Sequence, residues 1–400
     1  MKVRLKALQE QVVVLTGATS GIGLATARLA AGRGATLVLV ARNAQALRKL
    51  TDELGANGAT AAWVAADVGD ERQVEHVAAE AIRRFGGFDA WINDAGVSIY
   101  GSLSEVETRD MRRLFDTNFW GLVHGSLAAV RHFRERGGGK LVNVGSVLGD
   151  RSIPMQGIYS ASKHAVAGFT EALRSELDAE QLPVSVTLIK PSAIDTPYKE
   201  HAKNYFDNAP KNPPPVYEPR VVARAILHAL ENDVRDLVVG GGGRLITAAA
   251  AVAPRTADKV MAKTMPYFQE SGDPARPRSE NALYEPGDDS LQERSGYPFT
   301  LKRSAYTRAM MYPKTTLGLL GAAGLIAAGV VLAGRRWRGA EDLDTWEGDE
   351  FGAGTTDTAE AFDESGAGAA TSRSIATPAT ATPAGATVAG TAFPGGAAGR

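Results

Sequence analysis

The feature that most constrains the fold of this chain is a glycine-rich turn between an apolar strand and a helix. Residues 11–15 form a short run rich in β-branched side chains, which is typical of a strand buried in a parallel sheet. The turn that follows reads Thr16-Gly17-Ala18-Thr19-Ser20-Gly21-Ile22-Gly23. A helical pattern then ends near Gly32 and Gly34, and residues 36–40 supply the next strand. This order predicts parallel strands joined by helices.

The composition of the turn points to phosphate binding. Glycine lets the backbone approach a pyrophosphate closely, and the first N–H groups of the helix favour negative charge. The candidate contacts are Gly17, Thr19, Ser20, Gly21, Ile22 and Gly23. The spacing is G-x-x-x-G-x-G rather than the commoner G-x-G-x-x-G, so a plain glycine-rich loop is the alternative interpretation.

The end of the second strand bears on the choice of dinucleotide. It reads Ala41-Arg42-Asn43, with no acidic residue beside Arg42. An acid here commonly bonds the adenosine ribose of NAD, whereas an arginine accommodates the 2′-phosphate of NADP. The sequence therefore favours NADP(H) over NAD(H), and a solvated surface arginine is the alternative.

A tyrosine and a lysine four residues apart, Tyr159 and Lys163, follow thirteen residues after Ser146. In a helix both side chains lie on one face. A nearby cation favours the phenolate, so Tyr159 is a candidate for proton exchange near neutral pH. The Y-x-x-x-K spacing alone is common by chance. Together with the phosphate turn, it suggests hydride transfer to or from a carbonyl.

With these motifs the chain resembles the short-chain dehydrogenase/reductase family over roughly residues 8–240. Asp67-Val68, after a third strand at residues 61–66, resembles the pair that contacts adenine. Asn93-Asp94-Ala95-Gly96, after residues 88–92, resembles the family's N-N-A-G, with Asp94 in place of the second asparagine. The resemblance implies that Asn93, Ala95 and Gly96 belong to the cofactor site.

The resemblance also implies the catalytic residues, which are Asn118, Ser146, Tyr159 and Lys163. Tyr159 would be the general acid in reduction and the general base in oxidation. Lys163 would lower the pKa of this phenol and hold the nicotinamide ribose. Ser146 would hydrogen-bond the substrate oxygen, and Asn118 would hold a water that links Lys163 to solvent.

Two further cofactor contacts follow the strand at residues 184–189. Pro191-Ser192 stands where the family usually has Pro-Gly, and Thr196 matches its contact to the nicotinamide carboxamide. Each of these residues taken singly has an ordinary structural interpretation, as a turn former, a packed ring or a satisfied polar group. Their order and spacing together favour the functional interpretation.

The predicted fold class is α/β, a Rossmann-like doubly wound parallel sheet formed by residues 1–250. Gly17, Asn93, Ser146 and Pro191 each follow a strand, so we expect them to meet at the carboxyl edge of the sheet. The chain has no cysteine, and its six histidines form no metal pattern, so we expect no metal site. A net charge of −1 gives no sign of nucleic-acid binding.

The substrate side is expected in residues 195–220, a stretch rich in proline and aromatic residues that corresponds to the family's substrate lid. Ile153, Met155 and Ile158 would line the opposite wall. The length and aromatic content of the first segment predict a sizeable apolar substrate, a small-molecule carbonyl or alcohol, and neither segment has a charged cluster that would bind a charged one. A mere connector is the alternative for the first segment. Family members pair through the helices that carry Asn118 and Tyr159, which implies a homodimer or homotetramer.

The remaining chain is divided into three parts. Residues 251–312 have no firm assignment, but residues 255–268 fit an amphipathic helix with Val260, Met261 and Met265 on one side, packed on the surface, over the site or on a membrane. Residues 313–336 fit a transmembrane helix, with a buried helix as the alternative. Residues 337–400 are predicted to be a disordered low-complexity tail. The expected location is therefore a cytoplasmic catalytic domain associated with a membrane.

Two other functions are compatible with the same fold. One is a non-catalytic nucleotide-binding scaffold or sensor, against which the four catalytic residues argue. The other is epimerisation or dehydration, which the extended family performs with longer substrate domains that this chain's tail does not resemble.

Overall fold

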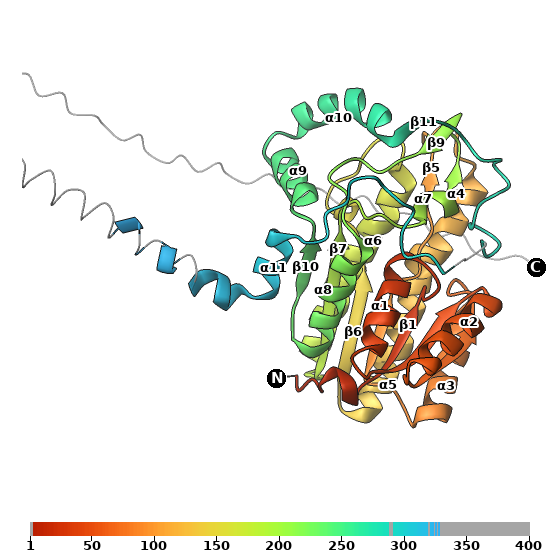
Figure 1. The fold of residues 1–400 in the computed structure, drawn as a ribbon, viewed down its shortest axis with the longest axis vertical. Coiled ribbons are helices and arrows are strands. Elements are labelled where there is room, and N and C mark those ends of the chain that lie inside the picture. The colour runs from red at the N-terminus through yellow and green to blue at the C-terminus, as the bar shows by residue number, and fades with distance from the viewer. Residues whose placement is uncertain (1–2, 288–290, 319–320, 324, 326, 329–400) are drawn as a thin grey trace, which may run out of the picture. The chain divides into compact units, whose positions relative to one another are not determined.

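The computed structural model describes residues 3–287, 291–318, 321–323, 325 and 327–328. Its centre is a seven-stranded sheet in which every neighbouring pair is parallel, and this confirms the predicted fold class (Figure 1). Across the sheet the strands are β10 (Asp236–Val239), β7 (Val184–Pro191), β6 (Gly139–Val144), β4 (Ala90–Asn93), β1 (Val12–Thr16), β2 (Thr36–Ala41) and β3 (Ala61–Ala65).

Helices cover both faces of this sheet, which is why its central strands are mostly apolar. One face is packed by α1 (Gly21–Ala31), α2 (Ala44–Ala56) and α8 (Pro219–Glu231). The other is packed by α3 (Glu71–Phe85), α5 (Gly121–Arg136) and α6 (Gly157–Ala179). Each fully buried Leu, Ile or Val side chain stabilises this arrangement by roughly 1.5–3 kcal/mol.

The carboxyl edge of the sheet is surrounded by short elements. These are η3 (Val147–Gly149) after β6, α4 (Thr108–Phe115) with the π-helical turn η2 (Asp116–Trp120), α7 (Tyr198–His201), and the short strands β5 (Ile99–Tyr100), β8 (Lys203–Asn204) and β9 (Asn208–Pro210). A further 3-10 turn, η1 (Leu8–Glu10), precedes β1.

The chain after the sheet packs back onto this edge. The structure contains α9 (Gly241–Val252), α10 (Pro254–Gln269), β11 (Glu270–Pro274) and α11 (Ala305–Met311), and β11 pairs antiparallel with β9. The helix predicted over residues 255–268 is thus present as α10. Met261 is buried, but Val260 is 53% exposed, because consecutive helical residues point about 100° apart. Val260 therefore does not share the buried side, contrary to the sequence-based expectation.

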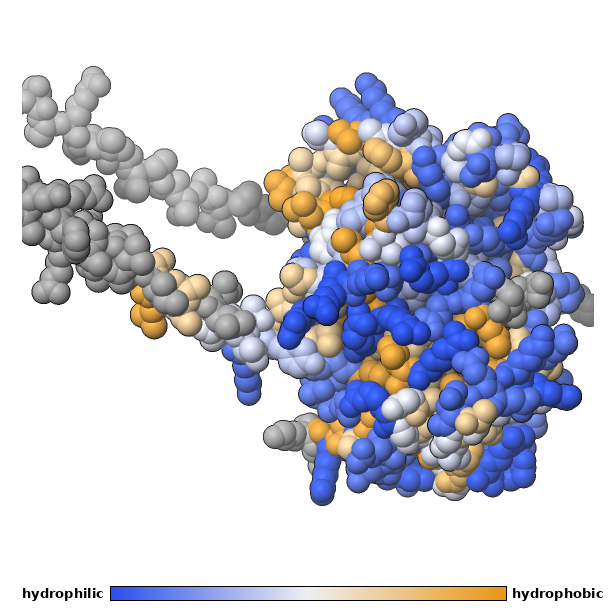
Figure 2. All heavy atoms as spheres, in the orientation of Figure 1, coloured by the Kyte–Doolittle hydropathy of each residue, from blue (hydrophilic) through white to orange (hydrophobic). Residues whose placement is uncertain are grey.

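None of the helices formed by the described residues is long and apolar enough to cross a membrane. Half of the predicted span at residues 313–336, and all of the predicted tail at residues 337–400, lie outside the described residues. Figure 2 shows apolar side chains gathered instead over α9 and α10, where Leu245 is 73% exposed and Val252 is 87% exposed.

Candidate active site

A cavity of about 460 Å³ lies at the carboxyl ends of the parallel strands, the edge where the sequence predicts the site. It brings together most of the predicted residues. They are Gly17, Thr19, Ser20, Gly21, Ile22, Arg42, Asp67, Val68, Ala95, Gly96, Ser146, Tyr159, Lys163, Pro191 and Thr196. Three predicted residues, Gly23, Asn93 and Asn118, support the cavity from behind its wall.

The glycines of the turn let α1 begin close to β1 and β4. Gly17 has a φ of +74°, and a Cβ there would lie 2.9 Å from the Cα of Ala95. A Cβ on Gly23 would lie 2.1 Å from the carbonyl oxygen of Gly17, so no side chain fits. The first residues of α1, Gly21 and Ile22, line the cavity, so it reaches the helix N-terminus, where anions are favoured. In this structure the nitrogen of Gly21 donates to the carbonyl oxygen of Gln292 at 3.0 Å.

Asn93 organises the sheet edge and does not face the cavity. Its amide nitrogen donates to Asn143 Oδ1 at 2.9 Å and to Ser126 Oγ at 3.1 Å, and its oxygen accepts from Trp91 Nε1 at 2.8 Å. Asn118 likewise hydrogen-bonds the backbone of Val97. Its amide donates to the oxygen of Val97 at 2.9 Å and accepts from the nitrogen of Val97 at 2.8 Å. Both amides position neighbouring loops.

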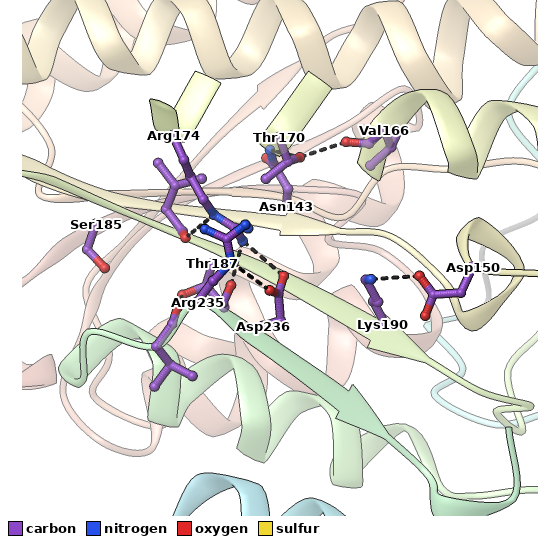
Figure 3. Close-up of polar contacts among 12 residues, drawn as sticks. Asn143, Asp150, Val166, Thr170, Arg174, Ser185, Thr187, Lys190, Arg235 and Asp236 are labelled. Atoms are coloured by element: carbon purple, nitrogen blue, oxygen red, sulfur yellow. Dashed lines mark hydrogen bonds and ion pairs between the residues drawn. The ribbon is translucent and has the colours of Figure 1, made fainter. Parts of the chain in front are cut away.

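The helix that carries Tyr159 and Lys163 is held against the sheet by polar contacts (Figure 3). Arg174 of α6 donates to the oxygen of Val186 at 3.0 Å and to Asp236 at 3.1 Å. Thr170, one turn earlier, accepts from the amide of Asn143 at 3.1 Å. These bonds fix α6 on β6, β7 and β10, so its first turns are presented rigidly at the cavity.

Ser146 is placed at the end of β6 as the N-cap of η3. Its Oγ accepts from the backbone nitrogen of Leu148 at 3.1 Å, so the hydroxyl hydrogen can be donated to a ligand oxygen. A salt bridge of 2.7 Å between Lys190 and Asp150 secures the loop behind it (Figure 3). The serine is therefore preorganised as a hydrogen-bond donor.

Tyr159 and Lys163 lie on one face of α6, with the ammonium 5.7 Å from the ring centroid. Lys163 donates to the backbone oxygen of Val144 at 3.0 Å. Burial raises the pKa of Tyr159 above its ordinary value, an effect that the hydroxyls of Tyr198 and Ser146 oppose and the carboxylate of Asp94 reinforces. The resemblance implies a lowered tyrosine pKa, and the structure shows the opposite direction because burial of the phenol dominates.

Asp94, the residue that departs from the family's motif, is an electrostatic partner of this pair. Burial lowers the pKa of Lys163 to about 8, and the negative charge of Asp94 opposes that shift. Burial raises the pKa of Asp94 itself to about 7, against the attraction of Lys163 and a backbone hydrogen bond from Gly23. The sequence analysis gave this substitution no role, because it reveals no proximity between residues 94 and 163.

The opposite end of the cavity is built largely by residues that carry no motif. Ile246 of α9 and Met261, Met265 and Phe268 of α10 line it, together with Ile153 and the prolines at 213–215. Of the aromatic residues expected in the lid, Tyr198 reaches the cavity, and its ring lies 5.5 Å from that of Tyr159. Tyr217 and Phe206 are buried elsewhere in apolar clusters.

The cavity wall also contains buried hydroxyls that have no hydrogen-bond partner within the described part of the chain. They are Thr117 Oγ1 and Ser192 Oγ. Leaving a buried hydroxyl unpaired costs about 1–3 kcal/mol, so such groups in a cavity wall fit a polar ligand. With the cradle formed by α1, they fit a dinucleotide. The described residues contain no cluster suited to a metal ion.

Comparison with known proteins agrees with this geometry. A family model described as short chain dehydrogenase matches residues 11–205. The chain is 47% identical over 328 residues to the uncharacterized oxidoreductase YxnA of Bacillus subtilis, a match covering 82% of this chain and 92% of that protein. The parallel sheet with a tyrosine and lysine at its strand ends thus defines a class of oxidoreductases. This chain belongs to the short-chain dehydrogenase family.

Solved structures of related proteins bind both kinds of nicotinamide dinucleotide. A short chain dehydrogenase/reductase from Burkholderia phymatum in complex with NAD is 27% identical, with a TM-score of 0.54 over 68% of this chain and 100% of that one. An alcohol dehydrogenase from Thermococcus sibiricus complexed with 5-hydroxy-NADP is 26% identical, with a TM-score of 0.50 over 57% and 95%.

Proposed function

We propose that this protein transfers a hydride between NADP(H) and an apolar carbonyl or alcohol, with Tyr159 as the general acid and base. The observation that carries the proposal is that one cavity joins the N-terminus of α1 to Ser146, Tyr159 and Lys163. A nucleotide-binding scaffold would need the cradle but no proton donor beside it. The alternative of a non-catalytic sensor is therefore less well supported.

The cradle residues Gly17, Gly21 and Ile22 would hold the pyrophosphate of the dinucleotide, which supplies the hydride when bound. Ser146 donates a hydrogen bond to the substrate oxygen and stabilises the negative charge that develops there. Tyr159 gives its hydroxyl proton to that oxygen as the C–H bond forms. Because the pKa of Tyr159 is raised, the phenol is protonated at neutral pH and ready for the reductive direction.

Lys163 supports both states of the tyrosine. Its ammonium attracts the phenolate that remains after proton transfer, and its lowered pKa, about 8, allows it to pass a proton on. By resemblance to the family, Asn118 would hold a water through which this proton is replaced. Lys163 would also bond the nicotinamide ribose.

The preference for NADP(H) rests on Arg42. This arginine lines the cavity at the end of β2, with Ala41 and Asn43 on either side and no acid to bind ribose hydroxyls. The preference for an apolar substrate rests on the Ile, Met and Phe side chains contributed by α9 and α10.

The test is a turnover assay of the full chain with NADPH or NADH and a panel of apolar ketones, followed at the nicotinamide absorbance band. We expect NADPH-dependent reduction of at least one medium-sized apolar ketone, with a higher kcat/KM for NADPH than for NADH. Absence of turnover with every ketone and with the matching alcohols in reverse, despite dinucleotide binding, would leave the sensor interpretation.

We also propose that the catalytic domain acts in the cytoplasm at a membrane, attached through residues 313–336. The support is the uncharged sequence between Lys314 and Arg335, together with the apolar, partly basic outer surface of α9 and α10 (Figure 2). Full-length protein should pellet with membranes, and a variant lacking residues 313–400 should not. Full-length protein found entirely in the supernatant would refute the attachment.

A further inference from the structure

The adenosine end of the cavity has a wall that the glycine turn and strand ends do not supply. Ala282, Pro286 and Gly287, from the chain between β11 and α11, line the same cavity as Arg42 and Asp67. We call residues 281–287 the C-terminal wall. In Figure 1 this part of the chain is the blue-green stretch that passes beyond the end of the sheet after β11.

Two arginines of the core hold this wall by its backbone. Arg42 donates to the carbonyl oxygens of Ala282 at 2.5 Å and Tyr284 at 3.0 Å. Arg113, which also pairs with Asp67, donates to the oxygen of Leu283 at 3.0 Å. Three consecutive carbonyls are therefore bonded to guanidinium groups, which is a strong and directional form of attachment.

Apolar and hydroxyl contacts hold the wall from its other side. Leu283 is completely buried in a cluster with Val97, Ile99, Val106 and Leu114. The hydroxyl of Tyr284 donates to Asp110 at 2.7 Å, and the nitrogen of Ala282 donates to the oxygen of His201 at 2.8 Å. The wall is thus packed as part of the domain and is not a loosely attached end.

The chain is anchored again just after the wall. The nitrogen of Gly21, at the start of α1, donates to the oxygen of Gln292 at 3.0 Å. Glu293 pairs with Arg28 at 3.0 Å and Arg220 at 2.9 Å, and Arg294 pairs at 2.7 Å with the fully buried carboxylate of Asp195. These contacts attach residues 292–294 beside the phosphate cradle.

We propose that the C-terminal wall is part of the dinucleotide site and contacts the adenosine half of the cofactor, and that Arg42 is a positioning residue that holds this wall. The proposal rests on the proposed function. It changes what Arg42 does: besides facing a 2′-phosphate, it shapes the adenosine site for any nicotinamide dinucleotide. Loss of Arg42 should then weaken the binding of NADH as well as that of NADPH. If Arg42 contacted only the 2′-phosphate, its loss would weaken the binding of NADPH alone.

The experiment measures the Kd of NADPH and NADH on the full chain, and turnover with reduced nicotinamide mononucleotide, which lacks adenosine. Gly287→Leu extends a side chain between His201 and Ala282, where a Cβ meets nothing closer than 3.4 Å. Its control is Gly272→Leu, at a glycine with open space around it. Arg42→Met is compared with both, and each variant is first checked for an unchanged melting profile by circular dichroism.

We expect Arg42→Met to raise the Kd of both dinucleotides by about tenfold or more, the loss expected for one or two charge-assisted contacts. Gly287→Leu should raise both Kd values by about the same factor, because its side chain takes up space beside the adenosine half of the cofactor. Turnover with the mononucleotide should be unchanged in Gly287→Leu, and Gly272→Leu should behave as wild type. An unchanged Kd in Gly287→Leu, or an Arg42→Met effect confined to NADPH, would refute the proposal that the C-terminal wall contacts the adenosine half of the cofactor. Wild-type protein that binds neither dinucleotide would instead refute the proposed function itself.

Discussion

The catalytic end and the adenosine end of the cavity are built from different kinds of sequence. At the catalytic end, Ser146, Tyr159 and Lys163 come from β6, η3 and α6, elements of the short-chain dehydrogenase domain itself. At the adenosine end, the backbone of residues 282–284, far along the chain, is bonded to Arg42 and Arg113. The catalytic end depends on the chemistry of side chains at a fixed spacing in the sequence. The adenosine end depends on where a segment that is distant in the sequence packs.

This difference has a physical consequence. Side chains at the catalytic end must hold specific atoms near a reacting carbonyl, so a single atom decides the rate. The adenosine end only needs a complementary surface, so its energy is spread over packing and backbone hydrogen bonds. Substitutions at the two ends should therefore affect different quantities, turnover at one and stability or binding at the other.

The largest difference between an effect on turnover and an effect on binding is expected from Tyr159→Phe. Removing the hydroxyl removes the proton donor, so kcat should fall by about 10²–10⁴-fold. The Kd of NADPH should change by less than about twofold, because no substrate proton is transferred in binding. The measurements are steady-state turnover and equilibrium binding. Tyr100→Phe is the control, since this tyrosine is fully buried but does not line the cavity. A Tyr159→Phe variant that keeps its turnover would exclude Tyr159 as the acid.

The sequence predicted the catalytic end well because its signals are local. The strand, the turn at residues 16–23 and the start of α1 are adjacent in the chain. Ser146 closely follows the end of β6 at Val144, and Pro191 is the last residue of β7. Asn93 was placed in the cofactor site by resemblance, yet its amide bonds Trp91, Ser126 and Asn143. The motif at residues 93–96 identifies Asn93 as a residue that shapes the loop, but the sequence pattern does not determine the direction in which its side chain points.

The next effect concerns the attachment of the C-terminal wall. Leu283→Ala should lower the free energy of unfolding by about 2–5 kcal/mol, because it leaves a cavity among Val97, Val106 and Leu114. Urea denaturation of the full chain measures this loss. The control is Leu103→Ala, where the side chain is 61% exposed and a change within about 0.5 kcal/mol is expected. A neutral Leu283→Ala would mean that the wall is not integral to the fold.

The parts of the adenosine end and of the substrate end that residues 251–312 supply could not be predicted, and the reason is the same for both. Residues 251–312 contain no motif, and their positions follow from tertiary contacts such as the pairing of β11 with β9 and the salt bridge between Arg294 and Asp195. An amphipathic pattern predicted α10 as a helix. It did not predict that Met261 and Met265 would face a cavity shared with Tyr159, since that depends on segments about 100 residues apart.

A smaller effect tests the apolar substrate wall. Ile246 lines the cavity, whereas Leu245, the preceding residue of α9, points to solvent and is 73% exposed. Ile246→Ser should raise KM for an apolar ketone by about tenfold, with little change in kcat, because the ketone would lose an apolar contact with this side chain, which is 44% exposed in the structure. Leu245→Ser should leave both constants unchanged. Equal effects of the two substitutions would mean that the substrate does not contact α9.

The smallest effect is expected from Asp94→Asn, which alters the charge around the catalytic pair without touching its atoms. The carboxylate of Asp94 raises the pKa of both Lys163 and Tyr159. Removing its charge should lower both pKa values, so both groups lose their protons at a lower pH. Since reduction needs the protonated tyrosine, the high-pH limb of the kcat profile should move to lower pH while the maximum rate is retained.

The control for that shift is Asp150→Asn, which removes a nearby carboxylate that is paired with Lys190 and is not among the charges that act on Tyr159 or Lys163. Its pH profile should match that of the wild type. A high-pH limb that stays in place in Asp94→Asn would mean that the limb reports a group that Asp94 does not influence, so that it belongs to neither Tyr159 nor Lys163. A limb that moves to higher pH would contradict the sign of the interaction, and the roles given to Tyr159 and Lys163 would have to be abandoned.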